Sequence, residues 1–97
     1  MTAQGSTAPQ LSALAIGGLT LSPTFDAGTY EYTTTTTNAT NTITATAAAG
    51  TSVIVLVNGS SITNGTAATW AEGENTVRIQ IANASGYNNY IVTVTKE

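Results

Sequence analysis

Apolar and polar residues alternate through several short segments of this chain, and this pattern restricts what it can fold into. In the clearest segment, residues 76–81, valine and isoleucine alternate with threonine, arginine and glutamine. Successive side chains of a strand point to opposite faces, so strict alternation predicts a strand with one buried face. No segment shows the 3.6-residue period of an amphipathic helix, and we therefore expect no helix.

The expected strands are short and are separated by clusters of glycine, asparagine, serine and proline. Asn58-Gly59 is the strongest two-residue hairpin signal, because both residues tolerate a positive φ angle, and Asn64-Gly65 repeats it. Roughly six to eight strands at spacings of about 8–12 residues predict a β-sandwich or a barrel. We expect strands or short strand-like pieces at residues 11–16, 19–23, 30–37, 42–47, 53–57, 66–70, 76–81 and 90–94.

The length of 97 residues suits one small domain with a single hydrophobic core. Residues 1–10 are mostly small and polar, so we expect a tail or linker there and the folded domain at residues 11–96. Threonine is abundant where charged residues are scarce, and its branched side chain suits half-buried pleated surfaces. The composition therefore also favours an all-β fold with a hydroxyl-rich surface.

Several classes of function are disfavoured by what the chain lacks. Arg78 and Lys96 are the only basic side chains, too few to follow a phosphate backbone, so we expect no nucleic-acid binding. No apolar run approaches 18 residues, so no segment is expected to cross a membrane. The first ten residues have no basic residue and no apolar core, so we do not expect them to form a signal peptide.

The chain also offers little for catalysis or for metal binding. Without His or Cys, the candidate acids and bases are five carboxylates, mostly in turns, and a serine nucleophile has no suitable base. Glu72 and Glu74 are the only close pair of acids, whereas calcium takes six to eight oxygen ligands. We therefore expect no enzyme activity, no metal site and no cofactor.

Five short landmarks stand in a fixed order along the chain, and together they resemble a known family. They are Leu21-Ser22-Pro23-Thr24-Phe25, Tyr32, Val55-Leu56-Val57-Asn58-Gly59, Gly73-Glu74-Asn75 and Tyr90-Ile91-Val92-Thr93-Val94. This order resembles the bacterial cadherin-like β-sandwich family, over roughly Leu11 to Lys96.

The resemblance implies an immunoglobulin-like antiparallel β-sandwich of about seven strands in two sheets. It implies no enzymatic activity, and it places such modules in bacterial surface or secreted proteins and in some phage virion proteins. The run Thr33–Thr37 departs from the family, which places apolar residues at alternate positions there. This departure weakens the expected core contribution of that strand and leaves its register open.

The strand at residues 53–57 contains the first candidate site. If Val53, Val55 and Val57 point inward, Ile54 and Leu56 must point outward, where polar residues are usual. Large apolar side chains on a solvated sheet face often mark an interface. We predict a protein–protein contact at Ile54 and Leu56; the alternative is that a loop or the N-terminal tail covers them.

A second candidate site is a carbohydrate-binding patch. Trp70, Tyr87, Asn88 and Asn89 would supply aromatic rings and amides of the kind that bind sugars. In the alternative, which we favour, Trp70 fills the core and Tyr87 caps a hairpin.

The setting that we expect is the surface of a virion. The chain begins with Met and has no export signal, which suggests a complete protein, and phage particles assemble without export. In this interpretation the sandwich faces outward as a decoration or structural component, and the tail, including Thr2, Ala3 and Gln4, grips other protein subunits of the shell. The alternatives are a spacer or adhesion repeat of a bacterial cell-surface or secreted protein, and a carbohydrate-binding module that recognises glycans.

Overall fold

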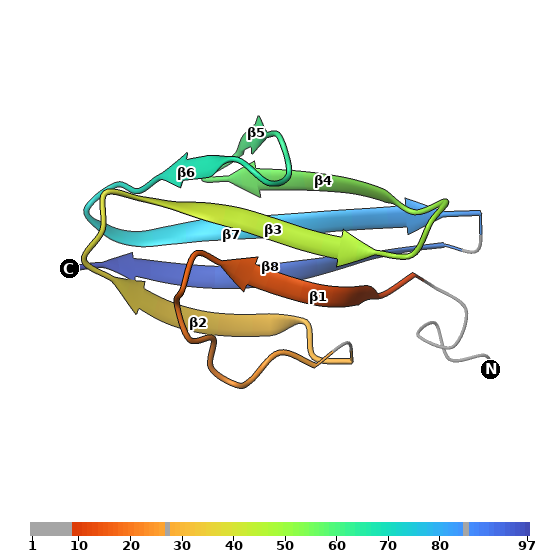
Figure 1. Ribbon diagram of the computed structural model, residues 1–97, viewed down its shortest axis with the longest axis horizontal. Coiled ribbons are helices and arrows are strands. Elements are labelled where there is room, and N and C mark those ends of the chain that lie inside the picture. The colour runs from red at the N-terminus through yellow and green to blue at the C-terminus, as the bar shows by residue number, and fades with distance from the viewer. Residues whose placement is uncertain (1–8, 27, 85) are drawn as a thin grey trace.

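The computed structural model describes residues 9–26, 28–84 and 86–97, in which the secondary structure is entirely β (Figure 1). The described strands are β1 (Leu11–Ile16), β2 (Glu31–Thr36), β3 (Thr40–Ala47), β4 (Ser52–Val57), β5 (Ser60–Ile62), β6 (Ala67–Thr69), β7 (Gly73–Asn83) and β8 (Gly86–Lys96). The prediction of an all-β fold is confirmed. The short strand β5 makes the number eight rather than about seven.

The strands form two facing sheets, which confirms the predicted sandwich. One sheet has three strands in the order β1-β3-β6, and the other has five in the order β2-β8-β7-β4-β5. Neighbouring strands are antiparallel, apart from β2, which runs parallel to β8 along the lower edge in Figure 1. The last strand therefore lies inside the larger sheet, between β2 and β7.

The core lies between the sheets and is built from alternate residues of each long strand. In β7 and β8 the inward positions are the predicted ones, and each of these side chains is at most 1% exposed. Each such valine or isoleucine contributes about 1.5–3 kcal/mol to the free energy of unfolding. The apolar inward residues of these two strands are Val77, Ile79, Ile81, Tyr90, Val92 and Val94.

The threonine run forms the inward face of β2 through its hydroxyl groups. Thr34 and Thr36 are buried, and their neighbours in the strand are exposed. The Thr34 hydroxyl donates to the carbonyl of Thr20 over 2.9 Å, and the Thr36 hydroxyl donates to Oδ1 of Asn41 over 3.1 Å. These bonds satisfy the buried hydroxyls, and the pairing with β8 sets the register that the sequence left open.

The two Asn-Gly pairs have different roles. Asn58 and Gly59 have φ angles of 51° and 88° and join β4 to β5, which confirms the predicted hairpin. The second hairpin prediction is wrong, because the strands flanking Asn64 belong to different sheets. The Asn64 side chain instead bonds to β3, accepting from the amide of Ala45 over 2.9 Å and donating to its carbonyl over 2.7 Å.

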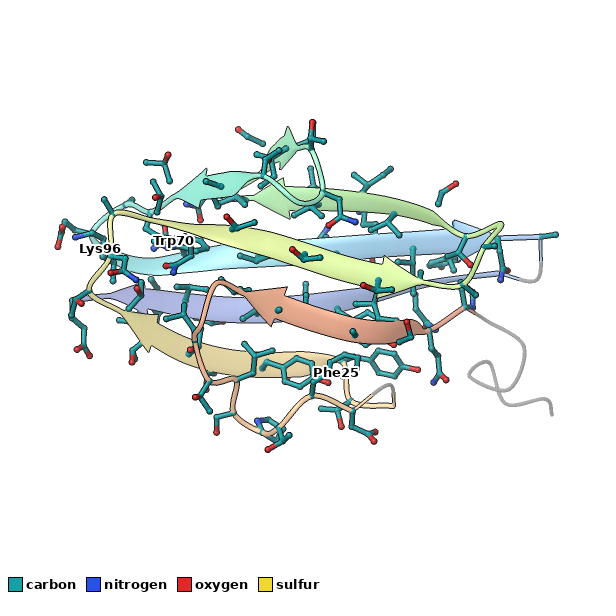
Figure 2. All side chains as sticks on the ribbon, in the orientation of Figure 1. Phe25, Trp70 and Lys96 are labelled. Carbon is teal, nitrogen blue, oxygen red and sulfur yellow. The ribbon has the colours of Figure 1, made fainter. Side chains whose placement is uncertain are left out.

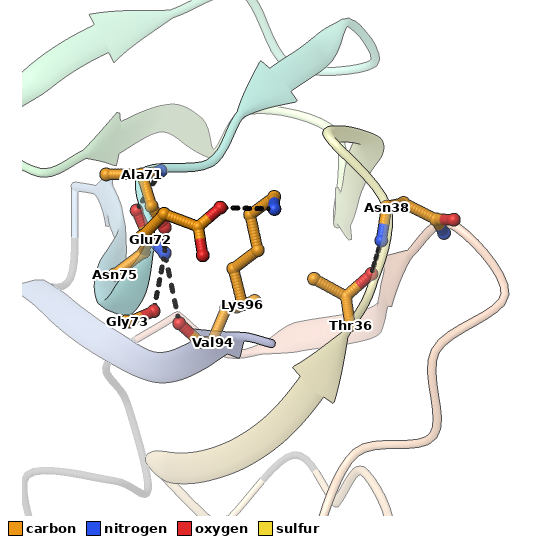
Figure 3. Close-up of polar contacts among 8 residues, drawn as sticks. All are labelled: Thr36, Asn38, Ala71, Glu72, Gly73, Asn75, Val94 and Lys96. Carbon is orange, nitrogen blue, oxygen red and sulfur yellow. Dashed lines mark hydrogen bonds and ion pairs between the residues drawn. The ribbon is translucent and has the colours of Figure 1, made fainter.

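A buried asparagine near the start of β7 bonds to the turn before that strand and to β8 (Figure 3), and also to Asn58 in the turn after β4. Asn75 has no exposed surface. Its Oδ1 accepts from the amide of Ala71 over 2.9 Å and from Nδ2 of Asn58 over 2.8 Å. Its Nδ2 donates to the carbonyls of Ala71, Gly73 and Val94 over 2.9, 3.1 and 3.2 Å. One amide group thus makes five hydrogen bonds, of which the bond to the carbonyl of Val94 is buried.

We expect Asn75→Ala to lower the free energy of unfolding by about 2–3 kcal/mol, because it removes a buried amide together with all of its hydrogen bonds. Urea denaturation measures this change. The matched control is Asn89→Ala, which removes an exposed amide and should cost at most about 0.5 kcal/mol. Equal losses in the two variants would contradict this account of Asn75.

Candidate functional site

The outward side chains of β4 lie where the sequence predicted them. Val55 and Val57 are buried, Ile54 is 48% exposed and Leu56 is half-buried. Across the sheet, Ile54 pairs with Gln80 and Leu56 pairs with Arg78. Among the described residues, Ile54 and Tyr87 are the large apolar side chains that are exposed.

The register of the sheet arranges the outward residues in rows that run across the strands. One row is Leu56 on β4, Arg78 on β7, Ile91 on β8 and Glu31 on β2. We call the outward side of this sheet the outer face. Its central residues are Ile54, Gln80, Asn89, Leu56, Arg78, Ile91, Glu31, Thr76, Thr93 and Thr33.

Ile91, Arg78 and Glu31 are members of this row that the sequence interpretation did not assign to a site. Alternation predicts that Ile91 points outward, because Tyr90 and Val92 point inward. The pairing of β8 with both β7 and β2 could not be predicted from spacing, so the row itself could not be found in the sequence.

Three shallow hollows lie on the outer face. Two of them border this row, and one borders the neighbouring row, which contains Ile54 and Gln80. The first, of about 370 Å³, lies against Pro23, Glu31 and Ile91. The second, of about 280 Å³, lies against Ile54, Gln80 and Tyr87. The third, of about 190 Å³, lies against Leu56 and Arg78. The outer face therefore has relief that the side chains of a partner could fill.

The charges near this face are sparse. Among the described residues, one ion pair joins Nζ of Lys96 to Oε2 of Glu72 over 2.7 Å (Figure 3). It lies at the end of the sandwich where β7 begins. Arg78 is exposed between Leu56 and Ile91, and its guanidinium forms no ion pair with another described residue. Its charge is available to a partner.

The predicted carbohydrate patch is not one surface. Trp70 is only 5% exposed, and its indole Nε1 donates to Oδ1 of Asn41 over 2.8 Å. Figure 2 shows Trp70 at the same end of the sandwich as Lys96. Tyr87 is the second residue of β8 and Lys96 is the last, so Tyr87 lies at the other end of that strand. Inclusion of Trp70 in the patch is therefore wrong, because its ring packs in the core and its N–H has an internal partner. Tyr87, which is 66% exposed, stays beside Asn88 and Asn89.

Thr2, Ala3 and Gln4, the predicted tail contact, lie outside the described residues. The described residues that precede β1 are held against β8. The carbonyl of Pro9 accepts from Nδ2 of Asn88 over 2.6 Å, and the amide of Leu11 donates to the hydroxyl of Tyr90 over 3.1 Å. Burial of Tyr90 raises the pKa of its hydroxyl above the ordinary value.

The described residues contain no cluster of three acidic, histidine or cysteine side chains that could hold a metal ion. They also contain no helix long and apolar enough to cross a membrane.

A family model described as a cadherin-like beta sandwich domain matches residues 11–97. The chain belongs to the cadherin-like β-sandwich family. No curated protein sequence matches it. Membership of the cadherin-like family indicates a non-catalytic module for protein interaction or adhesion.

We expect Trp70→Phe to lower the free energy of unfolding by about 1–3 kcal/mol, because it removes the bond to Asn41 and part of a buried ring. Thermal and urea unfolding measure this change. The control Tyr87→Phe removes an exposed hydroxyl and should cost at most about 0.5 kcal/mol. A stable Trp70→Phe protein beside a destabilised Tyr87→Phe protein would reverse the two assigned roles.

Proposed function

We propose that this cadherin-like domain is a non-catalytic module that joins protein subunits through the outer face of its five-stranded sheet. The observation that carries the proposal is Ile54, which is 48% exposed on a face where threonine and other polar residues dominate. Leu56 stands two residues along β4, and Ile91 lies further across the sheet. A partner that covers these side chains removes apolar surface from water.

Charge narrows the chemistry of the partner. Arg78 lies between Leu56 and Ile91 and has no ion pair within the described part of the chain. A protein surface that offers a carboxylate flanked by apolar side chains matches this row in both respects. Such pairing of charge adds specificity to a contact whose affinity comes from apolar burial.

The setting that we propose is the surface of a phage particle, where the module acts as a decoration or structural component. The family resemblance supports this setting, and it equally supports a spacer or adhesion repeat of a bacterial surface protein. The intact mass of the protein from its native source separates the two. A mass near 9.8 kDa fits a separate virion component, and a much larger mass fits a repeat of a longer chain.

Glycan binding is a second candidate function, and it is favoured by the surroundings of Tyr87. Two hollows, of about 280 and 460 Å³, share Tyr87, Asn88 and Asn89. Gln80 lines the first hollow, and its amide, like that of Asn89, makes no hydrogen bond to another described residue. An exposed aromatic ring that shares a hollow with the side-chain amides of Gln80 and Asn89 suits a neutral sugar.

We expect Ile54→Thr combined with Leu56→Thr to abolish the subunit contact while the domain stays folded, because both side chains point outward. The measurement is the fraction of tagged protein, expressed in its native host, that co-sediments with the phage particles or the cell-surface protein that it is proposed to join. The matched control is Ala13→Thr with Ala15→Thr on the exposed side of β1, which should co-sediment like the unmodified protein. Unchanged co-sedimentation of the Ile54 and Leu56 variant would show that the outer face is not the contact.

For the glycan candidate, we expect cellohexaose, chitohexaose or mannohexaose to shift the side-chain amide NMR signals of Gln80 and Asn89. Tyr87→Ala should abolish the shifts, since it removes the ring on which a sugar would stack. Trp70→Phe is the control and should retain them. If none of the three sugars moves these signals at about 10 mM, a concentration that detects even millimolar dissociation constants, glycan binding at Tyr87 is excluded.

A further inference from the structure

The outer face is complementary to itself, and we propose that the subunit it binds is a second copy of this chain. This inference rests on the proposed function and names the partner of the same face. It is carried by the order of three residues in one row: Arg78, Ile91 and Glu31.

Ile91 lies at the centre of this row. It pairs with Arg78 of β7 on one side and with Glu31 of β2 on the other. Neighbouring strands lie about 4.8 Å apart, so β7 and β2 place Arg78 and Glu31 on either side of Ile91 at similar distances between strands. All three side chains point outward, because Tyr90, Val92 and Tyr32 beside them are buried.

A two-fold axis that runs along β8, between two facing copies, converts this order into complementarity. Such an axis places each β7 residue opposite the β2 residue of the same row in the other copy. Arg78 of each copy then meets Glu31 of the other, and Ile91 meets Ile91. The contact therefore contains one apolar pair, Ile91 against Ile91. An ion pair between Arg78 and Glu31 lies on each side of it.

The neighbouring rows tolerate the same symmetry. In the next row, Thr93 lies between Thr76 and Thr33, so threonines meet threonines. In the row beyond, Thr95 lies between Glu74 and Thr35, so no like charges meet there. Leu56, one strand beyond Arg78, extends past Glu31 of the other copy, toward the hollow beside Pro23.

Charge also selects this axis over its nearest alternative. An axis along β7 would place Arg78 opposite Arg78, and like charges held in contact oppose association. The axis along β8 avoids this contact and uses both charged groups of the row. The usual angle between packed sheets, about 30°, inclines the axis by about 15° to each β8 strand and leaves the central row, over which the axis passes, in contact.

The test is a charge swap followed by analytical ultracentrifugation. The unmodified chain should show a monomer–dimer equilibrium. Arg78→Glu and Glu31→Arg should each weaken the dimer by at least about tenfold, and the double variant should return to within about threefold of the unmodified chain. The control pairs Arg78→Glu with Glu74→Arg, which has the same composition but does not place the new charges opposite each other, and it should not restore the dimer.

A chain that stays monomeric up to about 1 mM overturns the inference, since an association weaker than this is not a specific dimer. A dimer that the swap does not restore overturns it as well. The co-sedimentation experiment tests the proposed function independently of this dimer. If the chain is monomeric and the Ile54 and Leu56 variant still loses co-sedimentation, the outer face binds a different protein subunit.

Discussion

The arrangement of the larger sheet depends on the hydrogen bonds that the buried side-chain amide of Asn75 makes. It bonds to the turn before β7, to the carbonyl of Val94 on β8 and to Asn58 at the β4–β5 hairpin. Three strands are therefore held in one register at the same end of the sandwich. From that end, the alternation of side chains decides which residues face the core and which face outward.

The two outer surfaces of the sandwich differ because of this register. Strands β1, β3 and β6 carry no charged residue, and their exposed positions are mainly alanine and threonine. The five-stranded sheet carries Arg78, Glu31 and Glu74 together with the outward isoleucines. Specific recognition needs charge and apolar surface in a defined pattern, and the described strands present that pattern on the larger sheet alone.

The sequence was sufficient to predict the strands whose alternation is strong. The inward residues of β7 and the outward position of Ile54 follow from a period of two, which is a local property of the chain. The Asn58-Gly59 hairpin was also predictable, because its positive φ angles restrict the residue types. Asn64-Gly65 has the same local signal, but its side chain bonds to Ala45 on another strand.

Contacts between distant segments could not be predicted in this way. The pairing of β2 with β8 joins residues about sixty positions apart, and it alone brings Glu31 into the row of Arg78 and Ile91. The partner of Trp70 could not be predicted either, because the residues next to Trp70 in the sequence do not indicate that its indole N–H bonds to Asn41. The outward position of Ile54 on one strand could therefore be predicted, and the row that spans β4, β7, β8 and β2 could not.

We propose that the outer face of the five-stranded sheet contacts another protein in the native assembly. The most direct measurement places the photo-crosslinking residue p-benzoylphenylalanine at position 54, or at position 44 on the exposed side of β3, in the native host. We expect p-benzoylphenylalanine at position 54 to form adducts with another protein, and the same residue at position 44 to form none. Adducts from position 44 alone, or none from position 54, would contradict it.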